Sequence, residues 1–303
     1  MDGLIPVRKP SGCTSHDVVA RLRRILGQKK VGHFGTLDPL ASGLLLAAAG
    51  KATRLFPFYG KREKSYEGRI RLGYATDTYD REGQPAGETT DRFPPPDEVR
   101  AAMARFVGPF RQKPPAFSAK KIQGRPSYVY ARRREAMEPP EVPVVVTAFA
   151  LRTYDPPFLD FQVDCSSGTY VRSLAHDLGA ALGCGGHLAA LERTRVGEFS
   201  LGAARGLDEI QACMERGEPQ RFLVPLDALL PELPAVALGA DGASRTKDGR
   251  PLGLEHLADP AAFRGLRPDA APAVRLMGPD GALLALARPA PPPAVLAPFL
   301  VLG

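Results

Sequence analysis

Cysteine is scarce in this chain of 303 residues. The four cysteines are scattered, and no two of them form a Cys-x-x-Cys pair: they are Cys13, Cys165, Cys184 and Cys213. This spacing indicates neither a zinc site nor a disulfide framework. We therefore expect reduced thiols.

The chain also lacks a long apolar run and a leader in which a basic segment precedes an apolar one. It opens with Met1-Asp2-Gly3, and no stretch approaches the roughly 20 apolar residues of a membrane-spanning helix. We expect a cytoplasmic protein that does not contact a membrane. A glycine-rich phosphate loop and metal-ligand spacing are missing too, so the sequence gives no sign of a cofactor or a metal.

The composition favours a folded protein with an anionic partner. Hydrophobic residues make up 44% of the chain, and the length suits one large domain with a small appendix, or two domains. There are 40 basic and 33 acidic residues, which gives a net charge of +7. A positive surface favours anionic partners, although many basic proteins bind none.

The chain's most unusual loop holds a single acid, Asp38. The loop reads Gly32-His33-Phe34-Gly35-Thr36-Leu37-Asp38-Pro39-Leu40-Ala41-Ser42-Gly43. Its glycines permit backbone conformations closed to other residues, and Pro39 disfavours a helix at Asp38. Residues 44–49 are apolar without alternation, as in a strand covered on both faces. By spacing alone, the simpler interpretation of Asp38 is a turn acid that satisfies local amides.

Regular elements follow on both sides of this loop. Thr14 and Asp17 form a capping-box pattern before a helix that ends at Gly27. Residues 64–73 alternate strictly, which predicts a half-buried strand with Tyr66 facing inward, by default as a core residue. We also expect strands at 142–154 and 158–166, helices at 97–106 and 169–182, and a hairpin at 274–286.

The sequence alone does not decide the role of two polar features, the loop 76–83 and Arg172. The loop 76–83 is rich in acids and hydroxyls but matches no calcium-loop spacing, so we interpret it as a structural turn. Arg172 lies early in a helix, one residue from its apolar stripe. An isolated arginine there would usually extend to solvent.

The stretch 111–134 is the chain's most basic segment. It carries eight basic residues and no acid, and Phe110, Phe117, Tyr128 and Tyr130 are interleaved or adjacent. Basic side chains bind phosphates and aromatic faces stack on bases, so this segment favours nucleic-acid binding. The alternative is a flexible, solvated loop.

Four motifs together resemble the TruB-type tRNA pseudouridine synthases. The loop 32–43 fills every fixed position of that family's Gly-His-x-Gly-x-Leu-Asp-Pro-x-Ala-x-Gly pattern. Residues 64–66 fit Lys-x-Tyr, and 168–172 fit Gly-Thr-Tyr-x-Arg. Residues 183–188 fit Gly-Cys-Gly-x-His-Leu. The resemblance spans at least residues 4–227 and loosens after Leu191, because Thr194 stands where an apolar residue is expected.

The resemblance implies roles for individual residues. Asp38 would be the catalytic acid, and Arg172 would pair with it and favour its charged form. Tyr66 would pack on the target base or act as a base, and His33 could wedge into the space that the base vacates. The other implied substrate- or RNA-binding residues are Lys64, Tyr170 and Leu191 at the pocket and Lys120, Lys121 and Arg125 in an RNA-contacting insertion.

The resemblance also implies the fold and the reaction. The fold would be α+β, with a mixed, largely antiparallel sheet flanked by helices and a small C-terminal β-rich PUA-like domain. We expect a catalytic domain at 1–230, with a basic insertion at about 108–140, and the second domain at 231–303. The reaction would convert the uridine at position 55, in the T-arm of tRNA, to pseudouridine. It would need no cofactor and no metal, and we expect a monomer.

Two alternatives belong to other classes. One is a guide-RNA-dependent relative that modifies ribosomal RNA; the basic stretch 111–134 argues for a stand-alone enzyme, because a guide would take over substrate choice. The other is a tRNA-binding or tRNA-folding module without catalysis, against which the intact Asp38, Tyr66 and Arg172 argue. An Asp-based hydrolase would need a second acid, and none stands out by spacing.

Overall fold

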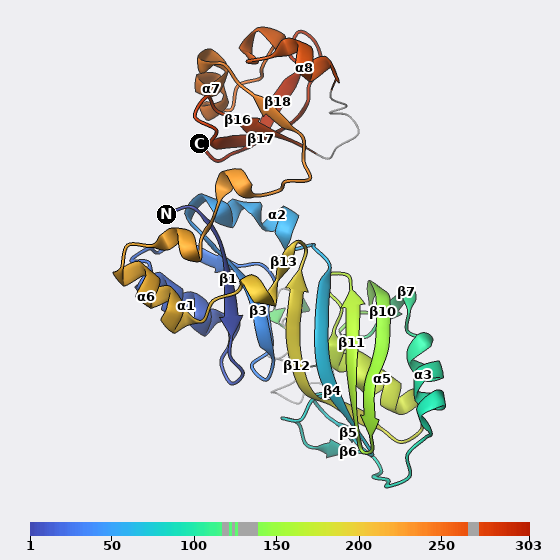
Figure 1. The fold of residues 1–303 in the computed structure, drawn as a ribbon. Coiled ribbons are helices and arrows are strands. Elements are labelled where there is room, and N and C mark those ends of the chain that lie inside the picture. The colour runs from blue at the N-terminus through green and yellow to red at the C-terminus, as the bar shows by residue number, and fades with distance from the viewer. Residues whose placement is uncertain (117–120, 123–124, 127–138, 266–272) are drawn as a thin grey trace.

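A ten-stranded sheet forms the centre of the molecule in this computed structural model, which describes residues 1–116, 121–122, 125–126, 139–265 and 273–303 (Figure 1). The strand order is β14-β1-β3-β12-β4-β11-β10-β7, with β2 paired to β3 and β13 paired to β12. Neighbours are antiparallel except β3 and β12, which are parallel. The expected mixed, largely antiparallel sheet is therefore confirmed.

The strands of this sheet are β1 (Gly3–Lys9), β2 (Val31–His33), β3 (Ser42–Ala49), β4 (Lys64–Leu72), β7 (Gly108–Gln112), β10 (Val142–Asp155), β11 (Phe158–Cys165), β12 (Gly186–Val196), β13 (Phe199–Ser200) and β14 (Val224–Pro225). The helices around it are α1 (Ser15–Ile25), α2 (Phe56–Tyr59), α3 (Pro96–Ala104), α5 (Val171–Ala181) and α6 (Leu207–Glu215). Two short hairpins lie outside the sheet: β5 (Ala75–Thr76) with β6 (Pro85–Ala86), and β8 (Lys121–Ile122) with β9 (Arg125–Pro126).

Strand β3 lacks alternation because it is covered on both faces. Leu45, Ala47 and Ala49 belong to the core cluster that includes apolar residues of α1 and α5. Leu44 and Leu46, on the other face, belong to a second cluster. The prediction of a doubly covered strand is confirmed, and it places rigid structure directly after the Asp38 loop.

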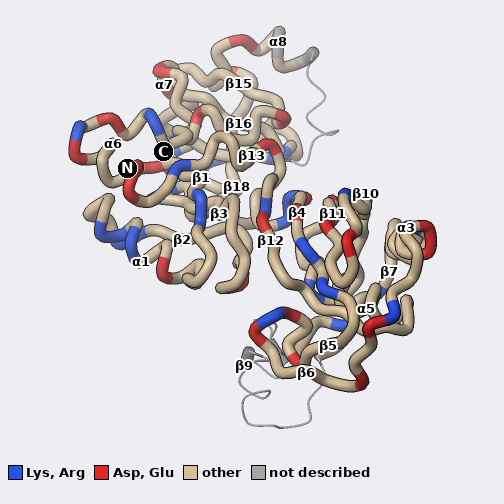
Figure 2. The backbone as a smooth tube through the Cα atoms, turned by 60° about the horizontal axis from the view of Figure 1, so that its bottom comes forward, with Lys and Arg blue, Asp and Glu red and all other residues tan. Residues whose placement is uncertain are grey.

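Helix α1 begins and ends as its sequence predicts. Thr14 and Asp17 form a reciprocal capping box, in which the backbone N–H of Asp17 donates to Thr14 Oγ1 over 3.1 Å. Gly27 follows the helix with a φ of +59°. Figure 2 shows basic residues gathered along this helix. Some of them have structural partners, since Arg21 pairs with Asp208 and Arg23 donates to the Val31 carbonyl over 2.9 Å.

Strand β12 was not anticipated, although it lies at the centre of the sheet. Its pairing with β4 is interrupted by register shifts between Leu188 and Ala190 and between Arg193 and Arg195. Each β-bulge adds one residue and breaks the period-two pattern by which a strand is recognised. The same irregularity explains the polar Thr194 in the loosened part of the motif.

A small β unit follows the ten-stranded sheet. Its strands are β15 (Ala235–Ala237), β16 (Val274–Met277), β17 (Leu283–Pro289) and β18 (Leu296–Val301), and its helices are α7 (Ala240–Lys247) and α8 (Pro260–Gly265). The expected hairpin is present as β16 and β17, with Gly281 at a φ of +79° in the turn. The division at residue 230 and the PUA-like character stay predictions.

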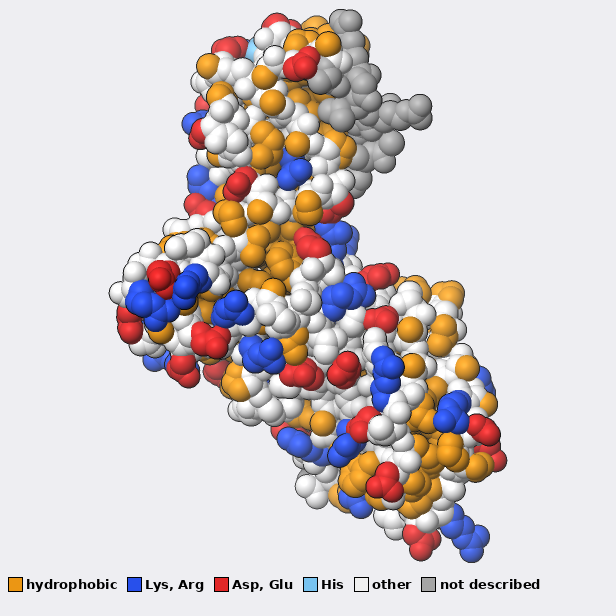
Figure 3. Space-filling model, viewed as in Figure 1, with side chains coloured by type: hydrophobic (Ala, Val, Ile, Leu, Met, Phe, Trp, Pro, Cys, Tyr) orange, Lys and Arg blue, Asp and Glu red, His pale blue; other side chains and the backbone are white. Residues whose placement is uncertain are grey.

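The second core cluster contains residues from both sides of residue 230. Leu4, Phe34 and Leu46 share it with residues of the C-terminal unit, namely Leu233, Ala273, Leu283, Leu286 and Leu302. Figure 3 shows hydrophobic side chains at this junction. The two parts of the chain are therefore joined by a common core. No helix within the described ranges is long and apolar enough to cross a membrane.

We predict that a chain ending at residue 230 is less stable than the full chain. Truncation removes five apolar partners, each worth on the order of 1 kcal/mol, from the face of β3 opposite α1. The midpoint of thermal unfolding should fall by about 10 °C. Circular dichroism on both chains tests this, and an unchanged midpoint would show that the sheet is stable alone.

Candidate active site

A cavity of about 420 Å³ opens beside the Asp38 loop. It brings together seven of the residues singled out in the sequence: His33, Asp38, Lys64, Tyr66, Tyr170, Arg172 and Leu191. They come from the end of β2 and the loop after it, from β4, from the N-cap and first turn of α5, and from β12. Of the other three, Lys120 lies outside the described residues. Lys121 and Arg125 lie in β8 and β9, where only the backbone is described.

The Asp38 loop is held by hydrogen bonds from three separate elements. Ser15, at the start of α1, accepts from the Leu37 N–H over 2.9 Å and donates to the Leu37 carbonyl over 3.1 Å. The ammonium of Lys9, at the end of β1, donates to the Ala41 carbonyl over 2.6 Å. The third contribution comes from Arg193 in β12. The position of Asp38 is thus set by tertiary contacts on both sides of it.

Two glycines in this loop are required by its shape. Gly35 and Gly43 have φ values of +98° and +102°. A Cβ on Gly43 would lie 2.4 Å from the backbone oxygen of Arg193, so any larger residue would push the loop off β12. Gly32 differs from this expectation, since it lies in β2 and has no positive φ.

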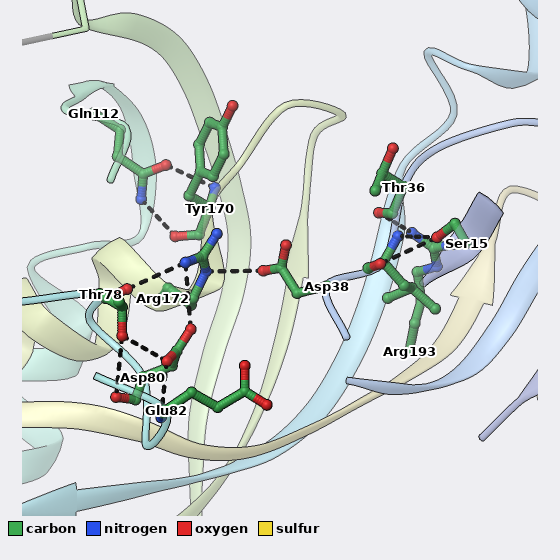
Figure 4. Close-up of polar contacts among 11 residues, drawn as sticks. Ser15, Thr36, Asp38, Thr78, Asp80, Glu82, Gln112, Tyr170, Arg172 and Arg193 are labelled. Atoms are coloured by element: carbon green, nitrogen blue, oxygen red, sulfur yellow. Dashed lines mark hydrogen bonds and ion pairs between the residues drawn. The ribbon is translucent and has the colours of Figure 1, made fainter. Parts of the chain in front are cut away.

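Arg172 is buried and pairs with Asp38 (Figure 4). Its Nε lies 2.8 Å from Asp38 Oδ2, and the side chain of Arg172 is 7% exposed while that of Asp38 is 38% exposed. Arg172 therefore does not extend to solvent, as an isolated arginine at the start of a helix usually would. Asp38 keeps one side towards the cavity while the guanidinium contacts the other.

A second carboxylate, Asp80, also contacts Arg172 (Figure 4). Nη1 of Arg172 lies 3.3 Å from Asp80 Oδ2 and donates to the Thr78 carbonyl over 3.2 Å. Asp80 is 4% exposed, and its Oδ1 accepts from Thr78 Oγ1 over 2.6 Å. The loop 76–83 is a turn, as predicted, in which the Gly83 N–H donates to the Asp80 carbonyl over 3.2 Å, but it also supplies a partner to Arg172. Its acids and hydroxyls gave a signal, but nothing in the sequence indicated that an arginine far along the chain was their partner.

Tyr66, Leu191 and His33 contribute to the apolar and aromatic surface of the cavity. Tyr66 is 7% exposed and Leu191 is 8% exposed. Burial raises the pKa of the Tyr66 hydroxyl, and the nearby Arg193 guanidinium opposes that rise. Burial, together with the charge of Arg193, lowers the pKa of His33, so its imidazole is neutral at pH 7.

Arg193 is a functional candidate that the sequence reading missed. Its side chain is fully buried, and it donates to the carbonyls of Leu44 over 2.7 Å and Gly35 over 3.0 Å, and to that of Thr36 over 3.3 Å (Figure 4). It thereby fixes the backbone before Asp38. Arg193 stands two residues after Leu191 on one strand, and this period-two spacing could have placed both side chains at the cavity.

Two further contacts shape the cavity wall. Gln112, at the end of β7, accepts from the Tyr170 N–H over 2.8 Å and donates to the Tyr170 carbonyl over 3.0 Å. Lys64 is 5% exposed, and its ammonium donates to the Arg62 carbonyl over 2.7 Å. Burial, with a contribution from Arg193, lowers the pKa of Lys64 to about 8.

Among the described residues, no group of three or more His, Cys, Asp or Glu could hold a metal ion.

Comparison with known proteins identifies the family. The model of the TruB family pseudouridylate synthase N-terminal domain matches residues 23–171, and that of the tRNA pseudouridylate synthase B C-terminal domain matches residues 172–231. A curated relative named tRNA pseudouridine synthase B, from Solibacter usitatus (strain Ellin6076), is 44% identical over 82% of this chain and 85% of its own. The chain belongs to the TruB family.

Other members and the solved structures extend this result over more of the chain. The tRNA pseudouridine synthase B of Burkholderia mallei (strain NCTC 10247) is 44% identical over 95% of this chain and 93% of its own. A chain from an H/ACA RNP bound to a substrate RNA containing 2'-deoxyuridine has a TM-score of 0.72 at 24% identity, covering 99% of this chain and 85% of that one. That likeness confirms the pseudouridine synthase fold with its small C-terminal β domain.

We predict that Asp80→Asn slows catalysis without weakening RNA binding. The amide keeps the size of Asp80 but removes the charge that balances Arg172, so the guanidinium is free to shift towards Asp38. A small misplacement of reacting groups costs up to about 100-fold in rate. Single-turnover pseudouridine formation and RNA affinity, measured on the same variant, test this. A variant with normal rate would show that Asp80 serves stability alone.

We also predict a pH effect that depends on Lys64. Since its pKa is about 8 in the folded protein, the ammonium is charged at pH 7 and loses its proton as the pH rises through 8. RNA affinity should fall about fivefold between pH 7 and 9.5, equivalent to about 1 kcal/mol for one charged contact. Lys64→Met should already bind that weakly at pH 7. A Met variant with the full pH dependence of wild type would assign it to another group.

Proposed function

We propose that this protein isomerises the uridine at position 55, in the T-arm of tRNA, to pseudouridine, acting in the cytoplasm as a monomer. The observation that carries the proposal is the ion pair between Asp38 and the buried Arg172, beside a cavity large enough to admit a nucleotide's base. The curated relatives at 44% identity are named tRNA pseudouridine synthase B.

Substrate binding begins with a base leaving its stack. Unstacking costs a few kcal/mol, which a fitted pocket must return. In our proposal Tyr66 packs on the uracil and Leu191 and Tyr170 close the pocket. A neutral His33, which costs less to desolvate than a charged one, occupies the space that the base vacates.

The chemistry then follows from the ionised Asp38. Its carboxylate attacks C1′ of the ribose or C6 of the base, and the N1–C1′ bond breaks. The uracil turns within the cavity, C5 bonds to C1′, and Asp38 is released; C5 then loses its proton and N1 takes one up. The product has the same atoms as the substrate, so the balance requires no cofactor and no metal.

The surroundings of Tyr66 help to decide between its two implied roles, packing on the target base and acting as a general base. A general base for the C5 proton would work best with a pKa near the working pH. Burial instead raises the pKa of this hydroxyl above its ordinary value. We therefore propose that Tyr66 acts as a stacking platform.

Affinity for tRNA comes from outside the cavity in this proposal. The insertion at about 108–140 contacts phosphates through Lys120, Lys121 and Arg125. Residues 231–303 form a PUA-like domain that grips the distal part of the tRNA, and residues 1–230 form the catalytic domain. Basic residues and an RNA substrate fit the net charge of +7.

The guide-RNA-dependent alternative is less well supported. The solved chain from an H/ACA RNP shares the fold at 24% identity, whereas the tRNA-modifying relatives are 44% identical over most of the chain. A binding module without catalysis would have no need of a buried arginine held between two carboxylates, which costs free energy to assemble.

We predict that Asp38→Asn forms no detectable pseudouridine, even in a single turnover, while its tRNA affinity stays within about twofold of wild type. The amide keeps the shape but cannot act as the nucleophile, and phosphate contacts and base stacking do not depend on the acid. Pseudouridine mapping in a tRNA transcript, with pure protein and nothing added, measures the rate. Asp160→Asn is the matched control, because Asp160 pairs with Arg69 outside the cavity. Appreciable turnover by Asp38→Asn would remove the basis of the proposal.

A further inference from the structure

An exposed aromatic ring stands at the edge of the cavity. Phe56, at the start of α2, is 54% exposed, more than any other large hydrophobic residue in the described part of the chain. It also lines the cavity that contains Asp38. Neither the ion-pair chemistry nor the base pocket of Tyr66 and Leu191 uses it, and about half of its surface stays in contact with solvent.

The ring is held rigidly in this position. It packs edge to face on the buried Phe34, with centroids 5.9 Å apart, and Phe34 stacks on Tyr59 over 5.9 Å. The Tyr59 hydroxyl accepts from the Leu230 N–H over 3.0 Å. Pro57 further restricts the backbone at the start of the helix. Little conformational entropy remains to be lost when a ligand covers Phe56.

The turn after α2 keeps one side of the ring close to the backbone and ties it to the cavity. A Cβ on Gly60 would lie 3.2 Å from the Phe56 ring, so glycine lets the ring lie against the chain. The Gly60 carbonyl accepts from Ser167 Oγ over 2.7 Å, which joins this turn to the segment that carries Tyr170 and Arg172. Phe56 and the proposed base pocket are therefore parts of one wall.

The basic residues near Phe56 in the sequence favour a nucleic acid over an apolar protein surface. Residues 51–64 contain five basic residues and one acid, Glu63. Arg62 pairs with Glu198 and Glu232, and Arg54 donates to the Val301 carbonyl. Lys51 and Lys61 have no carboxylate partner within the described ranges. An exposed aromatic face on a basic segment is the combination that binds single-stranded nucleic acid, by stacking on a base and neutralising phosphates.

We infer that Phe56 is a stacking platform for a second nucleobase, the one adjacent to the flipped uridine in the RNA loop. This subsite rests on the proposed function for its substrate, but it concerns binding and not the isomerisation. It holds the neighbouring nucleotide out of the loop's stack, so that the uridine enters the cavity while its 5′ or 3′ neighbour lies on Phe56.

The test is a double-mutant cycle between protein and RNA. Binding of a T-arm stem-loop is measured by fluorescence anisotropy for wild type and Phe56→Ala, each with intact RNA and with RNA abasic at the 5′ or the 3′ neighbour of the uridine. Phe56→Ala should weaken binding of intact RNA about 5- to 100-fold, the range for loss of one base–aromatic stack. With one of the two abasic RNAs, the same substitution should change binding less than twofold.

Matched variants separate stacking from stability. Phe56→Trp should bind within about twofold of wild type, whereas Phe56→Leu, which stays apolar but has no aromatic face, should resemble Phe56→Ala. Phe158→Ala is the control, since Phe158 is 37% exposed and pairs with Arg71, at the end of β4 distant from Lys64. Additive losses with both abasic RNAs, or a Leu variant as good as Trp, would overturn the inference.

The outcomes also separate this inference from the proposed function. If wild type forms no pseudouridine in any tRNA but the cycle shows coupling, the proposed activity fails and the subsite stands. If wild type forms pseudouridine and Phe56 shows no coupling to either neighbour, the subsite alone is wrong.

Discussion

The site depends on the burial of one guanidinium, that of Arg172. A buried cation is costly unless its charge and its hydrogen bonds are satisfied. Asp38 and Asp80 supply two carboxylates, and the Thr78 carbonyl supplies a further acceptor. These partners come from segments more than 90 residues away in the chain, so burying Arg172 requires the Asp38 loop, the turn at 76–83 and the start of α5 to meet in one arrangement. The chain can therefore bury Arg172 only when Asp38, the proposed nucleophile, lies in its observed position.

A second buried arginine, Arg193, has a different set of partners. Arg193 faces three carbonyls and, among the described residues, no carboxylate, so its hydrogen bonds are satisfied while its charge is not cancelled. Lys64, with a pKa near 8, adds another cation to the same wall. The cavity is therefore electropositive although Asp38 is paired. That field suits a polyanionic substrate, and it would also stabilise negative charge that develops on the uracil when its bond to C1′ breaks.

The sequence predicted the parts of this structure that local pattern controls. The capping box of α1, the alternation of β4, the unalternating β3 and the hairpin of β16 and β17 depend on neighbouring residues, and all four are present. Of the site, the sequence brought forward Asp38, Tyr66 and Arg172, and the structure brings them to one cavity. It did not reveal β12, whose bulges break the period of two, or Asp80 and Arg193, whose partners are distant in the chain. The residues that fix the site's geometry are the ones that only tertiary structure explains.

The short helix α2 connects the cavity to the C-terminal unit through its three aromatic residues. Phe56 lies at the cavity, Tyr59 is buried in the second core cluster, and Phe58 stacks on Phe299 of β18 with centroids 6.4 Å apart. Figure 1 shows α2 between the catalytic sheet and that unit. Because a close-packed interior transmits displacement, a shift of the C-terminal unit would move Phe58 and, through four residues of helix, the ring at the cavity. Helix α2 therefore joins the ring proposed to stack on RNA to the core that the two parts of the chain share.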